Sequence, residues 1–232
     1  MSSAAPSKVV PPCTREELNS FPSQLVKDEG PGAPQVTRFE LPEGAVILKE
    51  WTPSGHFLLR WWAGQIMRRE MQHYALLDGT PGIPRFRGAF DRNAFLIQWV
   101  DAQPLKRRLG KPLMETALDN LERVLAGLHQ RRFAHLDLHQ RLNTLVGADG
   151  EVWLIDLGQG LNCQRGPIRR LLFPLLARID RRALDKFRAR YVPHTIPEAR
   201  RDRLVKRYGE RKTDHFKHFH RWVRRLLSDD AD

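Results

Sequence analysis

Apolar and polar residues alternate along two short stretches near the start of the chain, which predicts β-strands over residues 36–41 and 45–50. The sequence LPEG between them is typical of a turn. Ala45, Ile47 and Lys49 share one face of the second strand, because side chains on a strand alternate in direction. A lysine on a half-buried face needs an anionic partner, whereas a lysine on an edge strand stays in solvent. The strand pattern alone leaves both interpretations open.

The next periodic stretch repeats its apolar positions every three or four residues and predicts a helix over residues 63–77. Its stripe consists of Trp62, Ile66, Glu70, Tyr74 and Leu77. Glu70 is the only acid on that stripe, so it is expected to face inward and to need a cation, for which Lys49 is the natural candidate. The competing interpretation is a solvated Glu70 paired with Arg68 or Arg69, although adjacent residues of a helix do not face each other.

Further elements follow from the same periodicities. The sequence DGTPGIP ends the predicted helix, and a hairpin is expected over residues 86–90 and 94–100. A strongly amphipathic helix follows, with apolar positions at Met114, Ala117, Leu118, Leu121, Val124, Leu125 and Leu128. A second hairpin is predicted with strands over residues 143–146 and 151–157, turned at the sequence GADG. Helices are expected over residues 171–190 and 198–227, with a break at Gly209.

The N-terminal residues, the cysteines and the apolar stretches indicate where in the cell the protein is expected. Residues 1–20 are rich in Ser, Pro and Ala, which predicts a flexible N-terminus without the features of a secretory signal. Cys13 and Cys163 are expected to be free thiols, because their spacing fits neither a disulfide framework nor a zinc site. No stretch reaches the ~18–20 apolar residues of a membrane span. The closest, residues 171–179, contains Pro174 and Arg178. We therefore expect a cytoplasmic protein and leave peripheral association with the inner face of the cytoplasmic membrane open.

Charge changes this picture further. The formal net charge is +12 and the pI about 10.4, which predicts attraction to nucleotides, phospholipid headgroups, acidic glycolipids or nucleic acid. Residues 181–227 carry 16 Lys and Arg against 5 Asp and Glu, so this region is either a solvated helical face or a surface for an anionic membrane. The predicted cationic surface consists of Arg200, Arg201, Arg203, Lys206, Arg207, Arg211 and Lys212. A nearby cluster, His215, His218 and His220 with Asp214, could bind a metal but matches no strong zinc signature.

The most informative chemistry lies between residues 135 and 158. Asp137 follows a predicted helix, Asn143 is expected on the first strand of the hairpin, and Asp156 is expected to end its second strand. Such an order can bring a proton acceptor and two oxygen ligands for magnesium to one point. The alternative is an ordinary surface hairpin with incidental acids. Two acids and an amide around one hairpin favour the chemical interpretation.

His135-Leu136-Asp137 and Asp156-Leu157-Gly158 resemble the catalytic loop and the D-F-G metal site of the protein-kinase fold. The resemblance implies an α+β fold of two lobes, with a flexible segment at residues 1–20, a β-rich N-lobe at 21–100 and a mainly helical C-lobe at 101–232.

The same resemblance implies ATP and Mg²⁺ as cofactors and assigns a role to each residue of the site. Asp137 would be the general base, and Asn143 and Asp156 would hold magnesium. Lys49, oriented by Glu70, would bind the α- and β-phosphates. The backbone of Gln98 and Val100, beside the hinge between the lobes, would receive adenine. His139 would either donate to the γ-phosphate or be a loop histidine bonded to the backbone.

Three departures from the kinase pattern bear on function. Asn143 follows Asp137 by six positions where the common loop has five. Leu136 replaces the arginine that reads a phosphorylated activation loop, and the segment after Gly158 is short, which favours a small-molecule or glycolipid acceptor over a regulated protein kinase. The phosphate-binding loop is degenerate or absent, because Pro31 and Pro34 remove amide donors around Gly30 and Gly32.

A narrower resemblance covers roughly residues 36–160. The chain is similar to the bacterial lipopolysaccharide kinases typified by the Kdo and heptose kinases. The shared residues are Leu48-Lys49-Glu50-Trp51, Arg69-Glu70, Gly79-Thr80-Pro81-Gly82-Ile83-Pro84, Asp137-Leu138-His139, Asn143 and Ile155-Asp156. The resemblance implies phosphotransfer from ATP to a hydroxyl of a lipopolysaccharide-core sugar or related glycolipid. The alternatives are an atypical, RIO-like Ser/Thr protein kinase and a catalytically silent kinase-like scaffold that docks on membrane or nucleic acid.

Overall fold

The computed structural model describes residues 11–28, 33–51, 57–105 and 109–208, and it has an α+β fold as predicted. The side chains of residues 57–60, 62 and 63 are outside this description. The chain divides into two compact units, Met1–Leu184 and Asp185–Asp232. The predicted lobe boundary at residue 100 falls within the first unit and stays a prediction.

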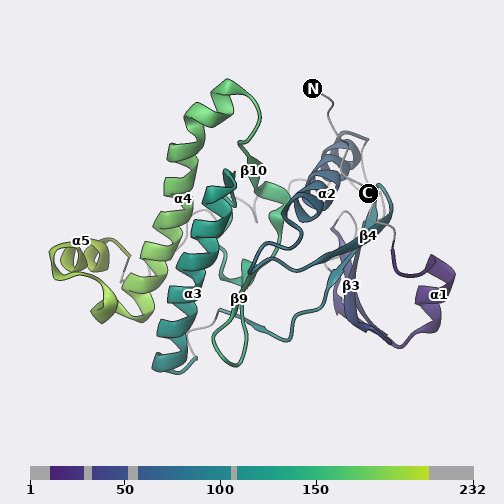
Figure 1. Cartoon of the computed structure of the whole chain (residues 1–232), viewed down its shortest axis with the longest axis horizontal. Coiled ribbons are helices and arrows are strands. Elements are labelled where there is room, and N and C mark those ends of the chain that lie inside the picture. Colours follow the sequence, from purple (N-terminus) through teal and green to yellow (C-terminus); the bar gives the residue numbers. More distant parts are fainter. Residues whose placement is uncertain (1–10, 29–32, 52–56, 106–108, 209–232) are drawn as a thin grey trace, which may run out of the picture. The chain divides into compact units, whose positions relative to one another are not determined.

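A five-stranded antiparallel sheet forms the first part of unit Met1–Leu184, with the strand order β1-β2-β3-β5-β4. Strands β3 and β4 of this sheet are labelled in Figure 1. Its strands are β1 (Ser23–Lys27), β2 (Gln35–Leu41), β3 (Gly44–Glu50), β4 (Phe86–Asp91) and β5 (Ala94–Gln98). Both predicted strand pairs are present, with Lys49 of β3 opposite Val36 and Phe95. Strand β1 was not predicted from the sequence, and its residues are exposed along its whole length. It therefore lacks the alternation that a half-buried strand shows.

Helix α1 (Arg15–Ser20) corrects the expectation of a flexible segment up to residue 20. Thr14 and Glu17 form a capping box, in which each side chain accepts a hydrogen bond from the backbone N–H of the other residue. Leu18 is only 1% exposed and belongs to the core cluster under the sheet, which also contains Phe39 and Leu48. The composition of residues 1–20 did not reveal this single buried leucine.

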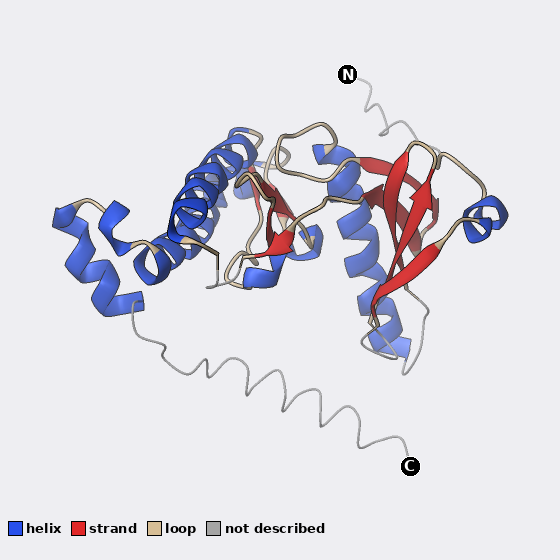
Figure 2. Cartoon of the chain, turned by 90° about the horizontal axis from the view of Figure 1, so that it is seen from below, coloured by secondary structure: helices blue, strands red, loops and turns tan. Residues whose placement is uncertain are grey.

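Helix α2 (Phe57–Leu77) lies beside the sheet and begins earlier than predicted (Figures 1 and 2). Glu70, Tyr74 and Leu77 are buried, so the predicted inward stripe is confirmed at those positions. Ile66 is only partly buried, and the neighbouring Met67, which was not part of the predicted stripe, is buried. After the helix, Asp78 accepts a hydrogen bond from the Phe86 backbone N–H at 3.0 Å and thereby joins the helix end to β4.

The helical part of the chain contains α3 (Lys111–Gln130), α4 (Pro167–Tyr191) and α5 (Glu198–Tyr208). Six of the seven predicted apolar positions of α3 are buried, and Val124 is partly exposed. Helix α4 starts earlier than predicted and continues from the first compact unit into the second. The rest of the predicted helix beyond α5, its break at Gly209 and the cluster at His215, His218 and His220 lie outside the described residues.

Short elements connect these helices. The small strands are β6 (Gln103–Pro104), β7 (Phe133–Ala134), β8 (Thr144–Val146), β9 (Val152–Leu154) and β10 (Leu161–Asn162), and the 3₁₀ turns are η1 (Arg141–Asn143), η2 (Leu157–Gln159) and η3 (Pro193–Thr195). The predicted second hairpin is β8–β9, but it is shorter than expected. Asn143 belongs to η1, and Asp156 lies two residues after β9 because its left-handed backbone cannot continue a strand.

Cys13 and Cys163 are free thiols, as predicted. Among the described residues, no helix has both the length and the apolar character needed to cross a membrane.

The role of Leu18 can be tested by truncation. Leu18→Ala should lower the free energy of unfolding by about 2–5 kcal/mol, because it removes a fully buried side chain and leaves a cavity. The matched control, Leu25→Ala, changes a leucine that is 54% exposed and should stay within about 0.5 kcal/mol of wild type. Urea unfolding of both variants measures the difference. Equal midpoints would show that α1 does not contribute to the core.

Candidate active site

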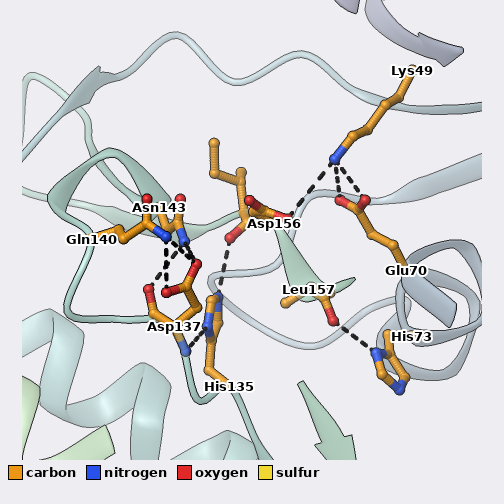
Figure 3. A network of polar contacts seen from close by, with 10 residues as sticks. Lys49, Glu70, His73, His135, Asp137, Gln140, Asn143, Asp156 and Leu157 are labelled. Atoms are coloured by element: carbon orange, nitrogen blue, oxygen red, sulfur yellow. Dashed lines mark hydrogen bonds and ion pairs between the residues drawn. The ribbon is translucent and has the colours of Figure 1, made fainter. Parts of the chain in front are cut away.

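A buried ion pair links the sheet to α2. The Nζ atom of Lys49 lies 2.7 and 2.6 Å from the two carboxylate oxygens of Glu70, so the predicted pairing is confirmed (Figure 3). The Glu70 side chain is 3% exposed and that of Lys49 is 16% exposed. Burial raises the pKa of the Glu70 carboxyl, and the Lys49 ammonium partly opposes this rise. The competing partner Arg69 instead donates to the Gly160 carbonyl oxygen at 2.8 Å.

Asp156 is the second acid near Lys49. Its Oδ1 atom lies 4.0 Å from the lysine Nζ, and its side chain is 47% exposed. The backbone has φ 62° and ψ 63°, which is the left-handed region and is costly for a residue other than glycine. Such strain persists only where surrounding contacts impose it, and it is concentrated at functional sites. The ion pair at Glu70 therefore fixes a lysine within reach of an accessible carboxylate.

Contacts between α2 and η2 hold the chain after Asp156. The Nδ1–H group of His73 donates to the Leu157 carbonyl oxygen at 2.8 Å, and burial lowers the pKa of His73. A Cβ atom at Gly158 would lie 3.1 Å from the Ile66 Cγ2 atom, which is tighter than most real contacts. Glycine therefore lets η2 approach the helix that carries Glu70.

Asp137 is buried and surrounded by side-chain donors. The Nδ2 group of Asn143 donates to the Asp137 carboxylate at 2.9 Å and to its backbone carbonyl oxygen at 3.0 Å. The Nε2 group of Gln140 lies 3.0 and 2.8 Å from the two carboxylate oxygens. The Nδ1 atom of His139 is 3.3 Å from the Asp137 Oδ1 atom. This histidine therefore contacts the carboxylate, whereas one of the two interpretations of the sequence had expected it to bond to the backbone. These donors fill the acceptor positions of the carboxylate.

His135 connects this loop to the segment before Asp156 as a neutral imidazole. Its Nε2–H group donates to the Ile155 carbonyl oxygen at 3.1 Å, and its Nδ1 atom accepts the Asp137 backbone N–H at 3.4 Å. Burial lowers the pKa of His135, which agrees with a ring that must accept at one nitrogen. Since the Ile155 N–H also donates to the Asn143 carbonyl oxygen at 3.0 Å, the segments of Asp137, Asn143 and Asp156 form one connected network.

Asp180 of α4 positions the same loop, and the sequence did not reveal it. Its carboxylate accepts the backbone N–H of His135 at 2.9 Å and of Leu136 at 2.8 Å, and it lies 3.1 Å from Nε2 of His129. Leu136 has φ 66°, another left-handed residue held by these bonds. The sequence offers only a weak indication of this role. Asp180 is an acid in an arginine-rich helix, and it lies one turn after Ala177 on the face that is buried.

The predicted adenine contacts lie at the end of β5. The Gln98 N–H already donates to the Arg85 carbonyl oxygen at 2.9 Å. Adenine binding there would therefore use the Gln98 carbonyl group. The Val100 carbonyl oxygen accepts the Ala102 N–H at 2.9 Å. The two residues stay predicted binding residues, and residues Gly30 to Gly32 of the phosphate-binding loop lie outside the described structure.

The oxygen atoms of Asp156 and Asn143 are suited to binding a hard cation such as magnesium, which needs few ligands from the protein. Within the described residues, no group of three or more His, Cys, Asp or Glu side chains is arranged to bind a metal. Magnesium, however, commonly uses one or two protein oxygens together with phosphates and water. Asp156 offers an exposed carboxylate. The Nδ2 group of Asn143 donates to Asp137, so its Oδ1 atom is the one that could bind a cation. These two residues therefore fit the predicted magnesium ligands.

The chain matches no protein-family model and no curated protein sequence.

Titration of the buried histidines should make stability depend on pH. His73 and His135 have lowered pKa values in the folded chain, so only the unfolded chain binds their protons just below the ordinary value of about 6.5. The stability they contribute is present above that pH and is lost as pH falls towards their folded values. Each such proton contributes at most about 1.4 kcal/mol per pH unit.

Urea unfolding between pH 8 and pH 5 measures this loss. In His73→Gln the amide still donates to Leu157 but does not titrate, so the decrease should be smaller than in wild type. The same pH dependence in both proteins would show that His73 does not contribute.

Proposed function

We propose that the protein is an ATP- and Mg²⁺-dependent phosphotransferase with a two-lobed, protein-kinase-like fold, and that it acts on a hydroxyl acceptor. The observation that carries this proposal is the placement of Lys49. A buried carboxylate holds its ammonium group at 2.6 Å, and the accessible carboxylate of Asp156 lies 4.0 Å away on a strained backbone. A structural ion pair needs no second acid nearby, whereas phosphate binding beside a metal ligand does.

When bound, Mg-ATP supplies the phosphoryl group and the cation that neutralises its oxygens. Lys49 binds the α- and β-phosphates, and Glu70 keeps its ammonium oriented. Asn143 and Asp156 contribute the protein oxygens for the cation. The chain's own contribution is therefore mainly positioning, which is what phosphoryl transfer requires.

Asp137 orients the acceptor hydroxyl and takes its proton. An arriving hydroxyl must first displace one of the four donor contacts on the carboxylate. Gln140 and His139 are exposed and can move away, whereas Asn143 is buried and stays in place. His135 and Asp180 act through the backbone and keep the carboxylate in position.

The acceptor we propose is a sugar of a lipopolysaccharide core or a related glycolipid. Leu136 presents no charged group for reading a phosphorylated loop, and its N–H is used by Asp180. Only residues 160–166 separate η2 from α4, and two of them form β10, which pairs with β7. This leaves little chain for a regulatory loop and favours a small-molecule acceptor over a protein.

Removing the lysine should impair nucleotide use. Lys49→Ala should abolish most of the thermal stabilisation by Mg-ATP, because the cation for the phosphates is lost. The control Lys111→Ala changes an exposed lysine at the start of α3 and should behave as wild type. Differential scanning fluorimetry with and without Mg-ATP measures the shift. Equal shifts in all three proteins would contradict the role of Lys49.

The chemical step can be separated from binding at Asp137. Asp137→Asn should leave the Mg-ATP thermal shift nearly intact and reduce turnover by ~10²–10⁴-fold, the usual range for a general base. Transfer of labelled phosphate from ATP to core glycolipids and to generic protein substrates measures turnover and identifies the acceptor class.

Asp156→Asn is the matched comparison, and it should instead weaken Mg²⁺-dependent nucleotide binding. If both variants lost only stability, the site would be structural and the silent scaffold would be the better description. Labelling of proteins alone would favour the RIO-like alternative.

A further inference from the structure

Helix α4 presents a stripe of large apolar side chains to solvent. Its members are between 43% and 80% exposed, and they are Ile168, Leu171, Leu172, Leu175 and Ile179. Their spacing of three and four residues places them on one side of the helix, over a length of about 16 Å. We call these five residues the α4 stripe. All of them lie within the unit Met1–Leu184.

The opposite side of α4 packs against the protein. Phe173 makes an edge-to-face contact with His129 of α3 at 5.9 Å between ring centroids, and Ala177 and Asp180 are buried. Figure 1 shows α4 running alongside α3. The α4 stripe is therefore not needed to hold this helix in place. Exposed apolar surface of this kind marks an interaction site.

The segment that carries the α4 stripe is basic and has no exposed acid of its own. Between residues 164 and 182 the only acid is Asp180, which is buried and bonded to the His135 loop. The exposed basic residues of the same segment are Arg165, Arg169, Arg170, Arg178, Arg181 and Arg182. Arg178 and Arg182 follow Leu171 and Leu175 by two helical turns, so they border the stripe. Arginine can lay its apolar stem along such a surface and keep its charge at the polar edge.

A basic hollow lies at the N-terminal end of the same helix. Its volume is about 320 Å³, and its lining consists of Gln130, Arg131, Arg132, Gln164 and Arg170. Arg170 is fixed by donation from Nε to the Gln164 carbonyl oxygen at 2.8 Å, and Gln164 donates to the Arg131 carbonyl oxygen at 2.9 Å. Arg170 is two residues from both Ile168 and Leu172, so it lies on the side of α4 away from the α4 stripe, and the hollow is separate from that apolar surface.

We infer that α4 docks on the surface of an anionic phospholipid bilayer, with the α4 stripe in the acyl-chain boundary and the arginines among the headgroups. An apolar stripe flanked by basic residues is the pattern of helices that lie in a membrane interface. Nucleic acid would use the arginines but not the five apolar side chains. A second copy of this chain, paired symmetrically across the stripe, would bring like charges together. The inference concerns binding alone, so it is independent of the proposed phosphotransfer.

Vesicle co-sedimentation tests this inference. The full chain should bind anionic vesicles that contain phosphatidylcholine and phosphatidylglycerol in a ratio of about 3:1. It should bind vesicles of pure phosphatidylcholine at least tenfold more weakly. Leu171→Glu/Leu175→Glu should lower binding to the anionic vesicles at least tenfold. The matched control, Leu25→Glu/Val26→Glu, places the same charges at exposed apolar residues of β1 and should bind as wild type.

A second pair of variants separates charge from apolar contact. Arg178→Gln/Arg182→Gln should weaken binding and reduce its dependence on salt, because fewer charges face the headgroups. Arg87→Gln/Arg92→Gln removes two exposed arginines elsewhere and should have a smaller effect on both. Thermal melting of each variant confirms that it is folded before binding is compared.

Three results would overturn the inference. One is wild-type protein that ignores anionic vesicles at low salt. Another is equal vesicle binding by wild type and Leu171→Glu/Leu175→Glu. The third is a wild-type dimer, seen by light scattering, that dissociates in the stripe variant and does not bind vesicles, since a second copy would then cover the α4 stripe.

Discussion

The buried carboxylate of Glu70 is the constraint on which the arrangement of the site depends. An unpaired charge in that position would cost several kcal/mol, so the chain must bring a cation to it. Lys49 supplies that cation from the central strand β3 and thereby joins the sheet to α2. Helix α2 then holds the segment after Asp156 through His73 and Arg69. The same helix α2 thus positions two separate parts of the proposed nucleotide site, one through Glu70 and one through His73 and Arg69.

A second buried carboxylate does the same for the Asp137 loop. Asp180 accepts two backbone N–H groups there, next to the left-handed Leu136. Asp156 is the corresponding strained residue on the other side of the network. Such backbone geometry costs of order 1–3 kcal/mol per residue and requires support from its surroundings. Asp180 provides this support for the Leu136 loop, and His73 and Arg69 provide it for the segment after Asp156.

Helix α4 connects this site to the surface. Its inner side carries Asp180, which fixes the Asp137 loop, and its outer side carries the α4 stripe. If the proposed phosphotransfer acts on a glycolipid, docking of that outer side would keep the protein at the surface where the acceptor resides. The search for the acceptor would then take place in two dimensions. The same helix would serve both positioning and recruitment.

The sequence by itself determined the helices and strands with strong apolar periodicity. It also revealed the charged residues that occupy positions where that periodicity calls for an apolar side chain. Glu70 was recognisable as the one acid on an apolar stripe, and Lys49 as a charge on a half-buried strand face. The order of Asp137, Asn143 and Asp156 around a hairpin was also readable. Only the tertiary structure decided that Leu18 anchors α1, that Asp180 holds a loop 45 residues away, and which side of α4 faces solvent. Periodicity shows that a helix has two faces, but long-range packing selects the partner of each face.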